Sequence, residues 1–142
     1  MKIQFTIPAH KDLISPFEDC EITSVEQIDT IPDATCTLIH LGNCCDFLPN
    51  RQEFLQKVVN KLRYGGHIIV EGTDLIEVSY GIARDLLQTQ DVQSILFHGR
   101  NSCSTIHEMK EYIQNLNLKI INNRLAQYKY SIRAERPQIQ NQ

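Results

Sequence analysis

The chain has 142 residues, of which 42% are hydrophobic and 22% charged, and its formal net charge is −3. The length and composition are those of one globular domain with a buried core, and a mildly acidic protein has no electrostatic reason to bind nucleic acid or an anionic membrane. No apolar run reaches the roughly 18 residues of a membrane span, and MKIQFTIPAHKD lacks a signal-peptide pattern, so we expect a cytoplasmic protein without membrane contact.

The N-terminal third carries three strand patterns. Residues 1–7 alternate between polar and apolar side chains and end before Pro8, which predicts a strand. Residues 20–25 form a weaker strand candidate. A turn at Pro32 and Asp33 then leads into an apolar strand over residues 35–41.

The next segment predicts a helix followed at once by a buried strand. Over residues 51–63 the apolar side chains form one helical stripe: Phe54, Leu55, Val58, Val59 and Leu62. Asn50 is in position to cap this helix, and Gly65 with Gly66 is expected to end it. The short apolar run 67–71 then predicts a strand buried on both faces.

Two further helices and two strands are predicted after residue 75. Residues 76–88 fit a helix whose apolar face holds Leu75, Val78, Ile82 and Leu86. A polar loop, FHGRNSCS, precedes a helix that starts at the capping-box pair Thr105 and Glu108, with the stripe Ile106, Met109, Ile113 and Leu116. Strands over 118–125 and 128–136 are so close in sequence that they must pair antiparallel.

This element order predicts an α/β fold in a single domain over residues 1–137, followed by a polar tail, 138–142. The sheet is expected to be mostly parallel, with one antiparallel strand contributed by the C-terminal hairpin.

The stretch PDATCTLIHLGNCCDFLPNRQEFLQKVVNKLRYGGHIIVEGTD resembles the second half of the class I S-adenosylmethionine-dependent methyltransferases, which have a Rossmann-like sheet. In that family a Pro-Asp turn precedes the fourth strand, and a helix ending in Leu-x-Pro-Gly-Gly precedes the fifth. Here Tyr64 stands where proline is usual, and no histidine accompanies Asp46 where the family has an acidic residue and a histidine. The closing hairpin resembles the family's sixth and seventh strands.

The first part of the family's pattern is abbreviated in this chain. Only about 34 residues precede the strand after the Pro-Asp turn, where the family has three strands and two helices. The family's cofactor loop needs glycine for positive φ and close approach to the ligand, yet no glycine precedes Gly42. For the ribose hydroxyls the acidic residues Glu21 and Glu26 are available, but neither lies in a recognisable motif.

Polar residues follow the two central strands, where ligands bind in open α/β sheets. They are Asn43, Cys44 and Asp46 after the first of these strands, and Glu71, Thr73 and Asp74 after the second. They could form an altered pocket, or they could cap the neighbouring helices or lie in solvated loops, which is the interpretation we favour.

Cysteine and histidine residues give weaker signals. Cys44 and Cys45 could be reactive, but buried apolar thiols are more common. The five cysteines contain no Cys-x-x-Cys pair, so we expect reduced thiols and no metal site. His98, Arg100 and His107 flank a loop that could form a lid or a partner contact, although His107 fits the exposed first turn of its helix better.

These patterns support two hypotheses. The first is a non-catalytic methyltransferase-like accessory, scaffold or assembly subunit that needs no cofactor and meets a protein partner, or a second copy, through the N-terminal side of the sheet. Short chains resembling this family accompany active enzymes and occur in viral genomes, so a phage or viral origin is one expectation. The alternative is a small methyltransferase that binds S-adenosylmethionine through an atypical or partner-completed site containing Asn43, Asp46, Glu71 and Asp74.

Overall fold

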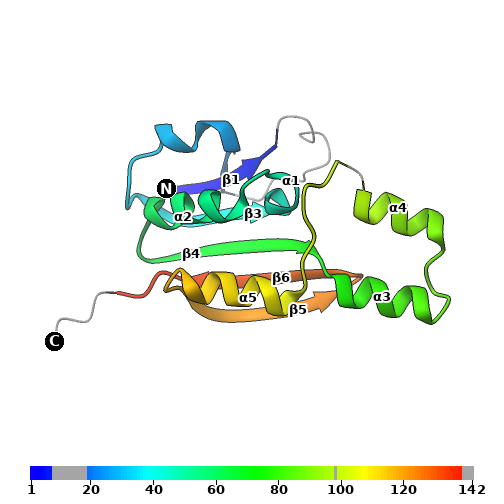
Figure 1. Ribbon diagram of the computed structural model, residues 1–142. Helices are drawn as coiled ribbons and strands as arrows, with labels where there is room; N and C mark the ends of the chain where they lie inside the picture. Colours follow the sequence, from blue (N-terminus) through cyan, green and yellow to red (C-terminus); the bar gives the residue numbers. More distant parts are fainter. Residues whose placement is uncertain (8–18, 98, 139–142) are drawn as a thin grey trace.

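The computed structural model describes residues 1–7, 19–97 and 99–138. Its centre is a six-stranded sheet in the order β2-β1-β3-β4-β6-β5 (Figure 1). The strands are β1 (Lys2–Thr6), β2 (Glu21–Ser24), β3 (Cys36–Gly42), β4 (Leu62–Thr73), β5 (Lys119–Ala126) and β6 (Lys129–Glu135). The first four strands are parallel, and β6 lies antiparallel between β4 and β5. This confirms the predicted α/β class and the mostly parallel sheet.

Helices surround the sheet unevenly. They are the 3₁₀ helix η2 (Val25–Thr30) and the α-helices α1 (Cys44–Phe47), α2 (Arg51–Lys61), α3 (Leu75–Ala83), α4 (Thr89–Phe97) and α5 (Ile106–Asn115). Figure 1 shows α2 and α5 against one face of the sheet, whereas α3 and α4 lie beyond the carboxyl ends of β3 and β4. None of the helices within the described ranges is both long and apolar enough to span a membrane.

The core lies between the sheet and the α2–α5 layer. Alternate residues of the strands point into it, and the predicted stripes of α2 and α5 face them. Its most buried members include Ile3, Phe5, Ile39, Leu41, Leu55, Val58, Ile68, Val70, Met109, Ile113, Ile132 and Ala134. Burying each large apolar side chain stabilises the fold by about 1.5–3 kcal/mol.

Both predicted helix caps are present. The Asn50 side chain accepts a hydrogen bond from the Glu53 backbone N–H at 3.1 Å at the start of α2. The Thr105 hydroxyl accepts one from the Glu108 N–H at 3.1 Å at the start of α5. These bonds satisfy amide groups that have no partner within their own helix.

The expected role of Gly65 and Gly66 as a helix stop is wrong. The helix ends at Lys61, and Leu62 already begins β4, where it pairs with Cys36. The glycines lie inside the strand instead. A Cβ on Gly66 would lie 2.8 Å from the Cys36 carbonyl oxygen, so the absence of a side chain allows two backbones to approach closely.

The region after α3 also differs from the prediction. The helix ends at Ala83 rather than Gln88, because the Leu86 and Leu87 amides both turn back to the Gly81 carbonyl. Asp85 takes a left-handed conformation there, with φ of 56°. Helix α4 was not predicted, although Val92, Ile95 and Leu96 have helical spacing.

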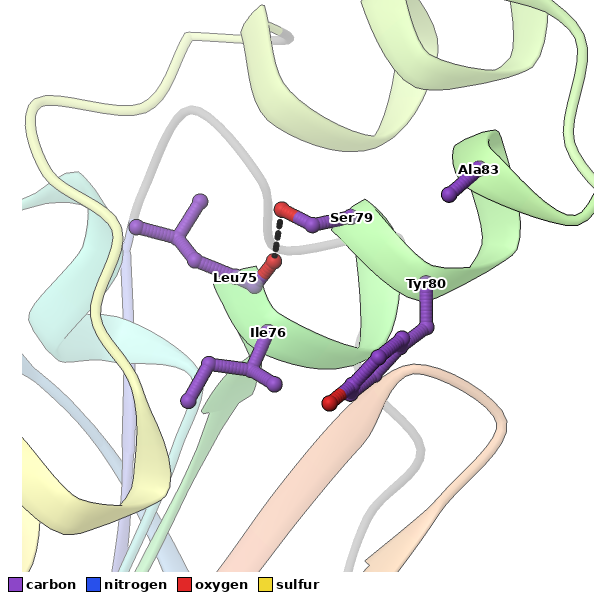
Figure 2. A pocket seen from close by; sticks show the side chains of 5 residues that line it. All are labelled: Leu75, Ile76, Ser79, Tyr80 and Ala83. Atoms are coloured by element: carbon purple, nitrogen blue, oxygen red, sulfur yellow. Dashed lines mark hydrogen bonds between the residues drawn. The ribbon is translucent and has the colours of Figure 1, made fainter.

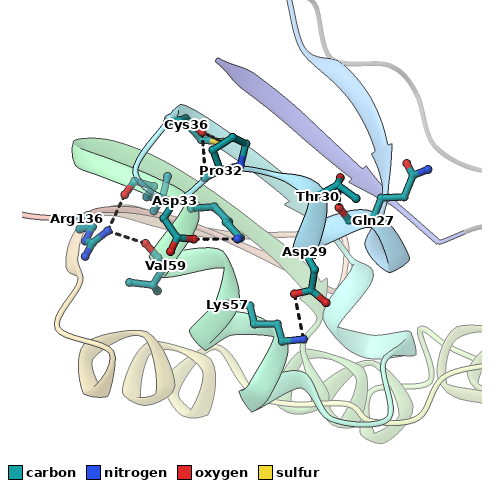
Figure 3. A network of polar contacts seen from close by, with 12 residues as sticks. Gln27, Asp29, Thr30, Pro32, Asp33, Cys36, Lys57, Val59 and Arg136 are labelled. Atoms are coloured by element: carbon teal, nitrogen blue, oxygen red, sulfur yellow. Dashed lines mark hydrogen bonds and ion pairs between the residues drawn. The ribbon is translucent and has the colours of Figure 1, made fainter.

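The segment between β2 and β3 is tied to α2, and the end of α2 is tied in turn to Arg136 (Figure 3). Lys57 lies 3.4 Å from the Asp29 carboxylate, and Lys61 lies 2.9 Å from that of Asp33. The Arg136 guanidinium donates to the Val59 carbonyl at 3.1 Å, at the end of α2. The two lysine contacts hold the segment with the predicted Pro32-Asp33 turn against α2.

Candidate functional site

The polar residues predicted after the two central strands lie together at one end of the sheet. Gly42 of β3 pairs with Val70 of β4, so Asn43 and Glu71 follow at neighbouring positions. The short helix α1 then carries Asp46 back over β4, where its Oδ2 accepts a hydrogen bond from the Thr73 N–H at 3.3 Å. Asp74 directly follows that residue.

Asp46 is completely buried and holds the loop that precedes α5. Its Oδ2 lies 3.5 Å from Nε of Arg100, and its backbone carbonyl accepts from the amides of Asn101 and Ser102 at 2.7 and 3.1 Å. Burial raises the pKa of the Asp46 carboxyl to about 6, against the lowering effects of the Thr73 amide and Arg100. Oδ1 has no hydrogen-bond partner among the described residues. The Asp46 carboxylate is therefore held inside the domain by contacts with the chain itself.

Asp74 joins two helices through one carboxylate. Its Oδ2 accepts from the Glu77 N–H at 2.9 Å and caps α3, while its Oδ1 accepts from the Ile106 N–H at 2.6 Å in the first turn of α5. Only 1% of the residue is exposed. Both oxygens serve the fold, which confirms the capping interpretation for this residue.

Glu71 and Asn43 are the two predicted residues that reach the surface. The Glu71 side chain is 40% exposed, and its Oε1 lies 3.5 Å from Nε2 of His40 on β3. Hydrogen bonding to His40 lowers the pKa of Glu71. Asn43 is half-buried at the start of α1, and its side chain makes no capping hydrogen bond. A ligand at this end of the sheet could contact these two side chains.

Tyr130 of β6 is buried beneath this region, and the sequence analysis did not predict it as part of the site. Its ring lies over Gly72, where an added Cβ would come within 2.5 Å of the hydroxyl oxygen. Burial raises the pKa of the phenol, and its hydroxyl has no hydrogen-bond partner among the described residues. The sequence signal was a tyrosine at a core-facing position of an alternating strand.

The cysteines near this site are not activated. Cys44 and Cys45 are buried, and Cys44 donates to the Phe5 carbonyl at 3.3 Å. Burial raises the pKa of Cys44 to about 12 and that of Cys45 as well, so both thiols stay neutral. All five cysteines of the chain are free thiols.

The loop before α5 is fixed by arginines on both sides. Arg100 lies 5.2 Å from the centre of the Phe47 ring, with its side chain 11% exposed. Arg51 of α2 contacts Ser104, the Glu108 carboxylate at 3.1 Å and the Tyr112 hydroxyl at 3.5 Å. The prediction that His107 lies exposed in the first turn of α5 is confirmed, whereas His98 lies outside the described residues.

The family's cofactor loop would directly follow β1, in residues 8–18, which lie outside the described residues. Glu21 begins β2 and Glu26 lies in η2, and both are exposed. The Glu26 amide donates to the Ser24 hydroxyl at 3.3 Å, which starts η2 at the carboxyl end of β2. An acidic side chain therefore stands at that strand end.

No family model matches the sequence, and no curated protein matches it significantly. Solved structures do resemble the fold. A methyltransferase from Thermotoga maritima aligns with a TM-score of 0.59 and 11% identity, covering 82% of this chain and 64% of its own length.

Two further structures give a similar result. Human N-acetylserotonin methyltransferase in complex with SAM aligns at 0.59 and 17% identity, over 96% of this chain and 41% of its own length. A chain of the complex between the Trm112 methyltransferase activator and a methyltransferase of Haloferax volcanii aligns at 0.58 and 9% identity, over 92% and 67%. This chain thus spans between 41% and 67% of the length of the three. Its fold is that of the class I S-adenosylmethionine-dependent methyltransferases.

Proposed function

We propose that this protein is a non-catalytic member of the methyltransferase fold that acts as an accessory, scaffold or assembly subunit. The observation that carries this proposal is that the Asp46 and Asp74 carboxylates bind backbone groups of the chain itself. Both carboxylates stand at the strand ends where the fold binds ligands. Both are buried and bonded to the chain's own backbone, through Oδ2 of Asp46 and both oxygens of Asp74, so neither is exposed to a ligand from solvent.

The structure of the N-terminal edge of the sheet supports the proposal that a protein partner binds at this edge. Two described strands precede β3, against the three strands that the family resemblance implies. The outer one, β2, has four residues, and its Ile22 is 47% exposed. Among the described residues, no strand pairs with the outer edge of β2, and an edge of this kind with an apolar side chain offers a site for strand pairing. We expect a protein partner or a second copy at this edge in a cytoplasmic setting, and neither nucleic acid nor a membrane.

A titration with S-adenosylmethionine tests the proposal. We expect no change in melting temperature and no heat of binding, because both strand-end carboxylates are buried inside the domain and bonded to its own backbone. A ligand at about one hundred times its Kd would add about 2.7 kcal/mol to the free energy of unfolding, which is easily measured for a chain of this size. An active methyltransferase run in parallel shows that the ligand is competent.

The alternative is a small S-adenosylmethionine-dependent methyltransferase whose site is atypical or completed by a partner. The exposure of Glu71 beside half-buried Asn43 favours it, and one similar structure is a methyltransferase–activator complex. Saturable micromolar binding of the cofactor, weakened by Glu71→Ala but not by the exposed-site control Glu111→Ala, would replace our proposal with this one. A phage or viral origin stays a prediction.

A further inference from the structure

Residues 99–104, which we call the strap, run from the end of α4 past α1 and the end of β4 to α5 (Figure 1). Backbone and side-chain contacts fasten the strap to α1. The Asp46 carbonyl accepts hydrogen bonds from the Asn101 and Ser102 amides at 2.7 and 3.1 Å. The Asn101 side-chain amide donates to the Phe47 carbonyl at 2.6 Å. The strap is therefore docked on the short helix that carries Asp46.

The two ends of the strap are held differently. The C-terminal end lies beside the first turn of α3, where the Leu75 amide donates to the Ser104 carbonyl at 3.0 Å. The Leu75 carbonyl in turn accepts the Ser79 hydroxyl at 2.7 Å (Figure 2). Arg51 of α2 also donates to the Ser104 hydroxyl. The N-terminal end follows α4, which has no buried residue, so the contacts with α1 hold that end to the domain.

Two buried polar atoms beneath the strap have no hydrogen-bond partner among the described residues. They are Oδ1 of Asp46 and the hydroxyl oxygen of Tyr130. The two residues are 0% and 1% exposed. A buried polar atom without a partner is rare and costly, because it has lost its hydrogen bonds to water. Both atoms would regain hydrogen bonds if the strap moved away and water entered.

The Asp46 carboxylate is surrounded by titratable groups from each element packed against it: Arg100 and Cys103 from the strap, Arg51 from α2, Cys44 and Cys45 from α1, Tyr130 from β6 and, just beyond β4, Asp74. Burial raises the pKa values of the phenol and of the three thiols, which therefore stay neutral. The two arginines favour the charged carboxylate. Burial outweighs them and raises the pKa of the Asp46 carboxyl to about 6.

We propose that the strap is a pH-sensitive device that leaves α1 without global unfolding, and that this opening is favoured as the pH rises. In the open state water solvates the Asp46 carboxylate, and α4 is no longer held to α1. A negative carboxylate gains more from water than a neutral carboxyl does. The closed strap therefore holds a proton on Asp46 that the open strap releases. Its stability is complete below about pH 4 and declines as the pH rises through 6.

Hydrogen exchange of the full chain, followed for single amides by NMR, tests this proposal. The reporters are the Asn101 and Ser102 amides, because both bond to Asp46. We expect their protection factors, which are corrected for the intrinsic effect of pH on exchange, to fall about tenfold between about pH 5 and 7.5. In Asp46→Asn, whose side chain has nearly the same shape and does not titrate, they should stay constant over this range.

A second variant tests the same device without altering the buried carboxyl. Arg100→Gln removes a charge that stabilises the closed strap only when Asp46 is ionised. We therefore expect it to lower strap protection at about pH 7.5 and to have little effect at about pH 5. The matched control is Arg63→Gln, an exposed arginine on β4, which should leave strap protection unchanged at both values.

The central amides of β4 serve as an internal reference for global unfolding. Faster exchange of the strap amides than of these amides is expected at both pH values. The proposal is overturned if the strap is protected as strongly as β4, because it then opens only when the whole domain unfolds. It is also overturned if strap protection does not fall with pH in the wild type, or falls equally in Asp46→Asn.

Discussion

A single buried carboxylate, that of Asp74, connects β4 to the first turns of two helices. Its two oxygens each accept one backbone N–H, from Glu77 and from Ile106. Asp74→Ala removes both bonds, and we expect it to lower the free energy of unfolding by about 2–3 kcal/mol. Asp74→Asn has only one acceptor oxygen and should cost about half as much. Urea unfolding measures both, with Glu111→Ala as the exposed control. Equal stability of the Asn variant and the wild type would disprove the double cap.

Asp46 predicts a dependence of stability on pH. Burial raises its folded pKa to about 6, above the ordinary carboxyl value of 3.8, so the folded state holds a proton that the unfolded state has lost between these values. The stability from this group is thus complete below about pH 4 and declines as pH rises through 6.

The pH prediction is tested by comparing Asp46→Asn with the wild type in urea at about pH 4.5 and 7.5. Between these values we expect the unfolding free energy of the variant to gain on that of the wild type by roughly 2 kcal/mol. The difference between the two proteins cancels other titrating groups. A difference that stays constant with pH would show that Asp46 ionises normally in the fold.

The sequence was informative about this site where the partners are close in the chain. Asp74 precedes the helix it caps, and capping chemistry identified that role. The burial of Asp46 was not predictable, because it depends on Arg100, 54 residues later, and on the return of α1 over β4. His40 escaped notice because it lies within an apolar strand, and its contact with Glu71 comes from strand register.

At the scale of elements, the predictions succeeded where a stripe of apolar residues meets the core. Helices α2 and α5 have such stripes and side-chain caps, and they lie close to their expected positions. The predicted end of α3 was wrong, because the residue with a left-handed conformation there is Asp85 and not a glycine, which would have indicated a helix end. Strand β4 begins at Leu62, before the position that the sequence predicted. Gly66 lies inside this strand, where the close approach of two backbones requires a glycine, and it does not end a helix.

At the scale of the whole molecule, the sheet carries the shared architecture, whereas the chemistry depends on individual residues. The parallel sheet and the inserted β6 reproduce the architecture of methyltransferases, but fold alone does not determine chemistry. At the end of the sheet where open α/β folds bind ligands, Asp46 and Asp74 hold the chain together. The domain also divides into a well-packed centre and a helical extension, α3–α4, several of whose large apolar side chains are exposed.

This division predicts a gradient of local stability that hydrogen exchange can measure. Amides in the central strands β3, β4 and β6 should exchange only through global unfolding, because their side chains fill the core. Amides of α4 should exchange fastest in dilute protein, since none of its side chains is buried. Protection of α4 equal to that of β4 in dilute protein would mean that the domain itself stabilises the helix.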